Sequence, residues 1–389
     1  MGKKRFEIRG NRATPMDEAD LMRRAMELAM RGRGRVEPNP MVGCVLVKDG
    51  RIVGEGYHEY FGGPHAEPNA LSVCAEAEGA TAYVTMEPCC HLNKKTPPCT
   101  RALIGAKIAR VVGACEDANP SVSGKGVQEL RDAGIRVETG VLEKEARQLN
   151  AAYFKMVSQG RPYVTLKWAQ TADGKIAGAG GRRLAISNAR SMGMVHRLRS
   201  RCDGILVGIG TVLVDDPLLT AREGDLTREA VRIVLDSDLR IGLESQLVRT
   251  ASQSPVLVCC GEAAILEKAD AVSALRGRGV ELMTIPADPI GGLSLEHLLD
   301  ELGARKMTHL LVEPGVKLAQ SFLRKNLADR VWIFRSPMRT EAADAPAAVR
   351  IDYPVSGRIS LDGDELSEYL NPGSGVFYSL QKTVDLGSV

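Results

Sequence analysis

The 389-residue chain contains no run of about 18 consecutive apolar residues, so the sequence predicts no transmembrane helix. Its first 12 residues include five basic side chains, but no apolar segment follows them, which argues against a secretory signal peptide. A short basic segment is more often a solvated tail than a binding arm. We therefore expect residues 1–15 to form a disordered basic tail and the protein to be cytoplasmic.

Aromatic residues are also scarce, at 4% of the chain, and the net charge of +3 is nearly neutral for this length. Proteins that bind nucleic acids need basic grooves and aromatic stacking platforms. The composition indicates neither feature, so we expect no nucleic acid and no membrane as partner. We expect a homo-oligomer that acts on a small molecule.

The nine cysteines are an odd number in a long chain without a signal peptide. This usage favours free thiols in a reducing compartment over a disulfide framework. Most of them are expected to be small buried side chains. Only Cys89, Cys90 and Cys99 form a cluster for which the sequence suggests a chemical function.

The length predicts two domains, and the first half alternates helical and strand patterns. Asp49-Gly50 between two apolar runs is a strong hairpin signal. Alternating strands and helices predict a layered α/β sheet. We expect helices at 16–30 (with Thr14 as a possible cap), 66–78, 126–133 and 149–157, and strands at 41–47, 52–56, 82–86, 110–114 and 135–138.

The most informative pattern is His65-Ala66-Glu67 followed by Pro88-Cys89-Cys90 and Cys99. One histidine and two cysteine thiolates make three zinc ligands and leave a fourth position open for water, as in catalytic zinc sites. Glu67 is not needed as a ligand and can carry protons between that water and a substrate. The pattern H-x-E…P-C-x-x-C is typical of zinc-dependent nucleobase deaminases. Here nine residues separate Cys89 from Cys99, where those enzymes have two.

Each of these residues also has an ordinary structural interpretation. A histidine before Ala-Glu is most often a helix start, and a Pro-Cys pair is most often packing, but the combination and its order favour zinc. Cys89 is the expected ligand of the adjacent pair, with Cys90 as the alternative. Asn39 stands between two prolines and is either a turn residue or a hydrogen-bonding partner for the edge of a pyrimidine.

The second half begins after Gly160-Arg161-Pro162 and again alternates strands with helices. Gly208 to Thr211 is a weak phosphate-loop signal and no Rossmann fingerprint is present. The following Asp215-Asp216-Pro217 is most simply a turn. We expect strands at 163–169, 203–207, 232–235, 256–259 and 309–312, and a turn at 171–176 that leads into a further short strand. We also expect a helix capped by Ser187 that reaches Arg199, and a helix opened by Gly315.

Three phrases of the first half together resemble the bifunctional riboflavin-biosynthesis family RibD, in which a pyrimidine deaminase is fused to a reductase. They are Pro38-Asn39-Pro40-x-Val42-Gly43-Cys44, His65-Ala66-Glu67-x-Asn69-Ala70-Leu71 and Glu87-Pro88-Cys89-x-His91…Lys95-Thr96-Pro97-Pro98-Cys99. The resemblance implies a cytidine-deaminase-like three-layer domain over residues 16–158. It implies zinc on His65, Cys89 and Cys99, Glu67 as proton shuttle, and substrate contacts from Asn39, His91 and Lys95, with Lys94 as the alternative to Lys95.

Two phrases of the second half are similar to the reductase part of the same family. They are Lys167…Thr171-x-Asp173-Gly174-Lys175-Ile176-Ala177 and Val207-Gly208-Ile209-Gly210-Thr211-Val212-Leu213-x-Asp215-Asp216-Pro217-x-Leu219-Thr220-x-Arg222. They imply a dihydrofolate-reductase-like α/β domain over residues 160–389 that uses NADPH. The resemblance implies that Ala169, Thr211, Asp215 and the segment from Gly315 to Ser321 line the cofactor site, and that Arg199, Leu219, Arg222 and Glu313 line the substrate site.

The second half departs from that family where Gly181-Arg182-Arg183-Leu184-Ala185-Ile186-Ser187 lacks the usual serine and tryptophan, and where Pro314 replaces a glycine. We hypothesise that the arginine pair, in particular Arg183, binds phosphate, because a guanidinium matches phosphate geometry. The implied function is deamination of 2,5-diamino-6-ribosylamino-4(3H)-pyrimidinone 5′-phosphate, followed by reduction of its ribosyl side chain. The alternatives are a deaminase with a degenerate reductase domain, a nucleic-acid-acting protein on the deaminase fold, and a protein whose zinc is only structural.

Overall fold

The computed structural model describes residues 16–92, 96–222 and 228–376, so the basic tail expected at 1–15 lies outside the described residues. The chain folds as two compact units. The first contains the residues up to Arg31, Val42–His58 and Gly63–Glu143. The second contains Gly32–Met41, Glu59–Gly62 and the chain from Lys144 onward. The two units therefore interleave in sequence between residues 31 and 63.

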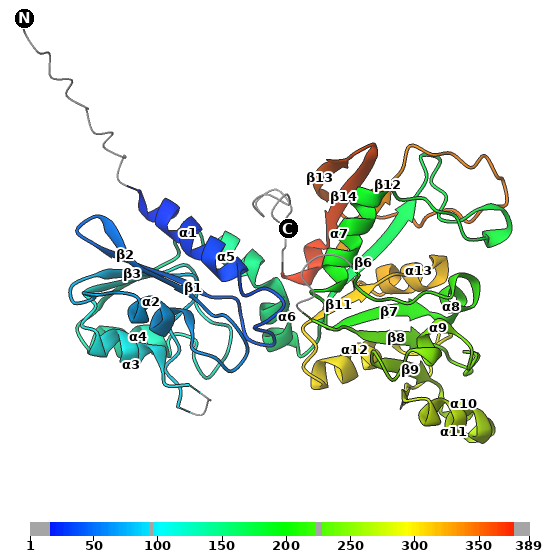
Figure 1. The fold of residues 1–389 in the computed structure, drawn as a ribbon, viewed down its shortest axis with the longest axis horizontal. Coiled ribbons are helices and arrows are strands. Elements are labelled where there is room, and N and C mark those ends of the chain that lie inside the picture. Colours follow the sequence, from blue (N-terminus) through cyan, green and yellow to red (C-terminus); the bar gives the residue numbers. More distant parts are fainter. Residues whose placement is uncertain (1–15, 93–95, 223–227, 377–389) are drawn as a thin grey trace, which may run out of the picture. The chain divides into compact units, whose positions relative to one another are not determined.

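A five-stranded sheet forms the centre of the first unit (Figure 1). Asp49 and Gly50 both have positive φ, at 50° and 71°, and make the tight turn of the first hairpin as predicted. The first strand pairs antiparallel with both of its neighbours, and the remaining strands are parallel. The strand order is β2 (Arg51–Tyr57), β1 (Gly43–Lys48), β3 (Thr81–Val84), β4 (Arg110–Gly113) and β5 (Arg136–Thr139).

Helices cover both faces of this sheet, which confirms the three-layer expectation (Figure 1). A Cβ added at Gly43 would lie 1.9 Å from the carbonyl oxygen of Ala25 in α1 (Glu18–Met30), so that helix packs directly on one face. Cys44 points to the opposite face and belongs to a buried cluster with Ala70 and Leu103. That second face carries α2 (Ala66–Ser72), α3 (Cys99–Gly105) and α4 (Lys125–Asp132).

Four predicted element boundaries were wrong, because tertiary contacts outweigh local propensity. Asp17, which accepts the N–H of Asp20, caps α1, and Thr14 lies outside the described residues. The second helix ends at Ser72 and not at Glu78, since turns lead the chain back to β3. The helix at 149–157 is two helices, α5 (Glu143–Leu149) and α6 (Ala151–Gln159). Asn188, not Ser187, caps α7 (Ala189–Arg199).

Nine strands form the sheet of the second unit. The first seven strands in the order are mutually parallel, and an antiparallel hairpin completes one edge. The turn predicted at 171–176 is present, with positive φ at Gly174, but the short strand expected after it is only a single bridge between Lys175 and Ala347. The order is β10 (Val280–Thr284), β9 (Val256–Cys260), β8 (Val231–Leu235), β7 (Gly204–Gly208), β11 (His309–Val312), β6 (Tyr163–Gln170), β12 (Arg330–Arg335), β14 (Asp364–Leu370) and β13 (Val355–Leu361).

Two hydrophobic clusters lie on the two faces of this sheet. Successive residues of β9 alternate between them, with Val256 and Val258 in one cluster and Leu257 and Cys259 in the other. No helix among the described residues is both long and apolar enough to span a bilayer. The remaining helices are α8 (Ile209–Asp215), α9 (Gln246–Arg249), α10 (Glu262–Glu267), α11 (Ala269–Gly277), α12 (Leu295–Ala304) and α13 (Val316–Arg324), with short 3₁₀ turns at Ala179–Gly181 and Pro372–Ser374.

Candidate active sites

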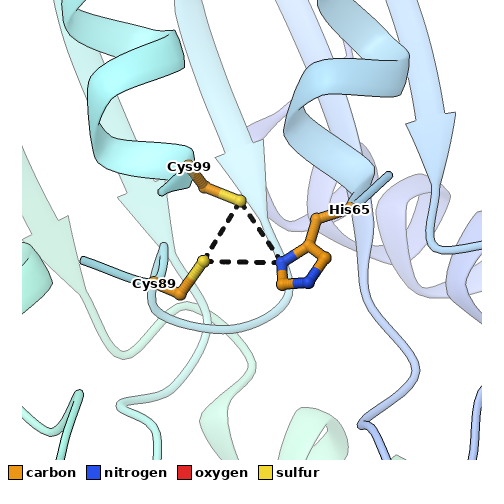
Figure 2. A group of neighbouring side chains, drawn as sticks. All are labelled: His65, Cys89 and Cys99. Carbon is orange, nitrogen blue, oxygen red and sulfur yellow. Dashed lines mark hydrogen bonds between the residues drawn. The ribbon is translucent and has the colours of Figure 1, made fainter. Parts of the chain in front are cut away.

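Three side chains that the sequence analysis singled out meet in the first unit (Figure 2). His65 stands immediately before α2, Cys99 is the first residue of α3, and Cys89 follows β3. The His65 Nδ1 atom lies 3.4 Å from the sulfur of Cys89 and 3.4 Å from that of Cys99, and the two sulfurs are 3.3 Å apart. Two helix starts and one strand end thus bring three ligand atoms to one point.

The donor set and its spacing fit zinc. The two separations of 3.4 Å between His65 Nδ1 and the sulfurs are close to the ~3.5 Å that Zn–N and Zn–S bonds of ~2.0 and ~2.3 Å span in a tetrahedral site. The two sulfurs, at 3.3 Å, are closer together than the ~3.8 Å of such a site. Two cysteines and one histidine leave one coordination position for water or substrate. The group contains Cys89 and not Cys90, whose half-buried thiol has its pKa raised chiefly by burial.

Glu67 is the second residue of α2 and is only 2% exposed. Burial raises the pKa of its carboxyl, the charge of Cys89 raises it further, and His65 lowers it, so this carboxyl lies beside the three ligand atoms. Its Oε2 atom is buried without a hydrogen-bond partner among the described residues. A buried carboxyl oxygen with no protein partner is suited to a water molecule or a substrate.

The other residues expected at the deaminase site have varied positions. His91 is half-buried in the loop that follows Cys90, and its Nδ1 atom is buried without a hydrogen-bond partner among the described residues. Asn39 belongs to the segment Gly32–Met41 of the second unit, where its backbone N–H donates to Val36. Lys95 and its alternative Lys94 lie outside the described residues.

A cavity of 1460 Å³ lies in the second unit, at the carboxyl ends of several of its parallel strands. Ligands in α/β sheets bind at this edge. All nine residues expected at the cofactor and substrate sites of the reductase line this one cavity. The residues expected to contact the cofactor are Ala169, Thr211, Asp215 and Gly315. Those expected to contact the substrate are Arg183, Arg199, Leu219, Arg222 and Glu313.

Glu313 is the centre of a charged group on the cavity wall. Arg199 binds it in bidentate geometry, with Nε to Oε1 at 2.7 Å and Nη2 to Oε2 at 2.9 Å. Lys167 Nζ lies 3.9 Å from Oε2. Burial alone would raise the pKa of Glu313, but Arg199 and Lys167 outweigh it and lower that pKa to about 2. Glu313 is therefore a fixed carboxylate.

Lys167 also lines the cavity, although it was not among the residues expected at either site. Burial lowers the pKa of this lysine, and the charge of Glu313 partly restores it. Its ammonium also lies 5.7 Å from the ring centre of Phe334. The available signal was a lysine in the middle of the apolar run Tyr163–Ala169, where a charged side chain needs a specific partner.

The loop after α8 has an unusual backbone that explains the Asp-Asp-Pro-x-Leu pattern. Asp216 and Leu219 adopt positive φ, at 39° and 53°. The Asp216 carboxylate accepts the N–H of Gln246 at 2.8 Å, and buried Arg232 donates to the Leu218 carbonyl oxygen at 3.3 Å. The run is a helix end and not the turn that its simplest interpretation predicted, since Asp215 is the last residue of α8 and Asp216 is its left-handed C-cap. It also borders the cavity.

Two features of the cavity suit phosphate groups. Gly315 precedes α13, whose first turn has no capping side chain, and both Gly315 and Lys317 line the cavity. Unpaired N–H groups at a helix start favour anions. The second feature is Arg183, which lies in a loop and also lines the cavity. Burial raises the pKa of the neighbouring Asp215, and the charge of Arg183 lowers it in part.

The chain matches two family models. The cytidine and deoxycytidylate deaminase zinc-binding region matches residues 16–115, and the RibD C-terminal domain matches residues 162–347. The riboflavin biosynthesis protein RibD of Aquifex aeolicus is 43% identical over 321 residues, which cover 82% of this chain and 87% of that protein. The RibD of Escherichia coli is 39% identical over 335 residues, covering 83% and 88% of the two chains.

Solved structures give the same result. The RibD of Acinetobacter baumannii superimposes with a TM-score of 0.78 at 35% identity, covering 91% of this chain and 98% of that one. The diaminohydroxyphosphoribosylaminopyrimidine deaminase/5-amino-6-(5-phosphoribosylamino)uracil reductase of Thermotoga maritima also has a TM-score of 0.78, at 36% identity, with coverage of 91% and 98%. These similarities extend over both units of the chain.

Proposed function

Because the chain belongs to the RibD family of riboflavin-biosynthesis proteins, we propose that it both deaminates a pyrimidine and reduces its ribosyl side chain. The substrate is 2,5-diamino-6-ribosylamino-4(3H)-pyrimidinone 5′-phosphate, and the final product is 5-amino-6-ribitylaminouracil 5′-phosphate. The observation that carries the deaminase assignment is the group of three ligand atoms, 3.3–3.4 Å apart, beside the buried carboxyl of Glu67.

In the deaminase unit His65, Cys89 and Cys99 hold zinc, and Glu67 is the catalytic residue. Zinc, when bound, makes a nucleophilic water available near pH ~7. Glu67 takes one proton from the attacking water and gives it to the ring nitrogen. It then takes the second proton, from the hydroxyl group now on the ring carbon, and gives it to the amine, which leaves as ammonia as the carbonyl forms. Burial raises the pKa of the Glu67 carboxyl, and a group that both accepts and releases a proton needs a pKa above that of an exposed carboxylate. Asn39, His91 and Lys95 hold the substrate.

In the second unit NADPH, when bound, supplies the hydride, and the protein binds and orients the two reactants. Ala169, Thr211, Asp215 and Gly315 contact the cofactor. Arg222 and Arg183 provide positive charge for phosphate groups in the cavity. Because Arg199 already spends two N–H groups on Glu313 and a third on the Thr220 carbonyl oxygen, its contribution is to fix that carboxylate.

The finer parts of the assignment are also proposals. The near-neutral charge and few aromatic residues support a small-molecule substrate without nucleic acid or membrane as partner. We place the deaminase domain at residues 16–158 and the reductase domain at 160–389, working as a homo-oligomer in the cytoplasm.

A coupled assay on the zinc-loaded full chain tests the function. The diamino pyrimidinone phosphate is supplied with and without NADPH, and ammonia release and NADPH absorbance are followed together. Both signals are expected, with NADPH consumption dependent on prior deamination. Ammonia release with no NADPH consumption would identify a deaminase with a degenerate second domain. The absence of both signals would contradict the whole assignment.

Substituting Arg183 tests the altered segment at 181–187. Arg183→Ala is expected to raise the KM of the substrate or of NADPH about 10-fold, because a charged hydrogen bond to phosphate is lost. Ammonia release is expected to stay unchanged. Steady-state kinetics of the reduction measure this. Arg182→Ala is the matched control, since Arg182 is absent from the cavity lining. Unchanged KM values for both ligands in Arg183→Ala would contradict a phosphate role.

A further inference from the structure

We propose that Glu87 is a positioning residue for the metal centre. It holds Cys89 in place by fixing Pro88 against helix α4. Glu87 is 5% exposed and stands two residues before Cys89. It is not a member of the group of ligand atoms. The inference rests on the proposed zinc site and extends it to a residue that does not touch the metal.

The Glu87 carboxylate accepts four backbone N–H groups from a distant part of the chain. Oε1 accepts from Gly126 at 2.9 Å and from Val127 at 3.2 Å. Oε2 accepts from Gly124 at 3.0 Å and from Asp117 at 3.3 Å. Gly124 is the N-cap of α4 and has no side chain to cap it, so Glu87 satisfies the first-turn amides of this helix. The carboxylate also lies at the positive end of the helix dipole.

The same helix start touches the peptide between Glu87 and Cys89. A Cβ added at Gly126 would lie 2.1 Å from the carbonyl oxygen of Pro88 and 3.2 Å from Oε1 of Glu87. Real Cβ atoms do not approach a backbone oxygen so closely, so only glycine permits this contact. Hydrogen bonds on one side and close packing on the other fix Pro88 against α4.

Cys89 is held from its other side by the helix that carries the second cysteine. Its carbonyl oxygen accepts the N–H of Thr100 at 3.3 Å, and Thr100 directly follows Cys99. Cys89 therefore lies between two anchors, α4 through Glu87 and Pro88, and α3 through Thr100. The separation of 3.3 Å between the sulfurs of Cys89 and Cys99 depends on both anchors. Groups that orient a metal ligand change metal affinity when they are removed.

The test substitutes Glu87→Gln in the full chain and measures zinc affinity by competition with a chromophoric chelator. Whichever way its amide is turned, glutamine places an NH₂ group where one carboxylate oxygen accepted two backbone N–H groups. The NH₂ group cannot accept these hydrogen bonds, so half of the anchoring is lost. The zinc dissociation constant is expected to rise about 10–100-fold. The visible spectrum of the Co²⁺-substituted protein is expected to change, because the geometry around the sulfur of Cys89 changes.

Val127→Ala is the matched control, since it shortens a buried side chain of the same helix turn and keeps the N–H that binds Glu87. It is expected to lower Tm while zinc affinity and the Co²⁺ spectrum stay as in the wild type. Gly126→Ala keeps the charge of the carboxylate but displaces Pro88 and crowds Oε1 of Glu87, and it is expected to weaken zinc binding as Glu87→Gln does. It decides the question if Glu87→Gln does not fold.

Three outcomes would overturn one of the proposals. Wild-type zinc affinity and spectrum in Glu87→Gln or in a folded Gly126→Ala would overturn the positioning role. An equal loss of zinc affinity in Val127→Ala would do the same, because the effect would then follow stability alone. A wild-type protein that binds no zinc would overturn the zinc site itself, and this result is distinguishable because it precedes any substitution.

Discussion

Replacing Glu67 with glutamine is expected to leave zinc bound and to slow deamination by about 10²–10⁴-fold. Glutamine keeps the size of the side chain but cannot take a proton from water and return it to the substrate. Zinc content is expected to stay the same, because the ligand atoms belong to His65, Cys89 and Cys99 and not to Glu67. Ammonia release and zinc per chain, by elemental analysis, measure the two effects on the same sample.

Glu55→Gln is the matched control for this substitution. Glu55 lies on the same unit and pairs with Arg24 near the surface, so the change removes an equal charge far from the proposed chemistry. Its deaminase activity is expected to equal that of the wild type. In Glu67→Gln, reduction of the already deaminated pyrimidine is expected to continue. Near-normal ammonia release from zinc-loaded Glu67→Gln would contradict the catalytic assignment.

Arg199→Met is expected to destabilise the second unit by about 3–5 kcal/mol and to reduce NADPH-dependent reduction strongly. Arg199 is 9% exposed and makes two charged hydrogen bonds to Glu313. Without it, the ion pair that remains to this largely buried carboxylate within the described part of the chain is the one with Lys167, at 3.9 Å. Chemical denaturation followed by circular dichroism gives the stability, and a NADPH absorbance assay gives the activity.

Arg161→Met is a closely matched control in the same unit. Arg161 also binds a carboxylate in bidentate geometry, with Nε and Nη2 2.6 Å and 3.0 Å from the oxygens of Asp300. That pair is largely exposed to solvent, so its loss is expected to cost at most about 1 kcal/mol. Equal destabilisation by Arg161→Met and Arg199→Met would contradict the importance of burial at Glu313.

The same pair predicts a pH dependence of stability. The pKa of Glu313 is lowered from 4.5 to about 2 in the folded chain, so its contribution is complete above the unfolded-state pKa and is lost as pH falls through the folded one. The free energy of unfolding of the wild type is therefore expected to decline as pH is lowered from 4.5 toward 2. Arg199→Met is expected to show a shallower decline over this range, and an identical slope would contradict the prediction.

Local patterns in the sequence predicted the parts of the fold that depend on neighbouring residues. Asp49-Gly50 defines its hairpin because these two residue types tolerate positive φ. Short apolar runs separated by helical segments predicted most strands of the parallel sheet. Helix ends were less predictable, since the chain leaves α2 at Ser72 to reach β3, and Asn150 separates α5 from α6 while its side chain binds the backbone of Met41. These contacts join residues far apart in sequence.

The sequence alone determined the kind of chemistry, because His65, Glu67 and the cysteine cluster combine in an order that few other functions need. Only the tertiary structure decided which side chains meet. It selected Cys89 over Cys90 for the group of ligand atoms, and it paired Arg199 with Glu313, 114 positions away. Distances between side chains follow from how strands and helices pack, and a linear pattern contains no record of that packing. Burial has the same origin, and it is burial that raises the pKa of Glu67.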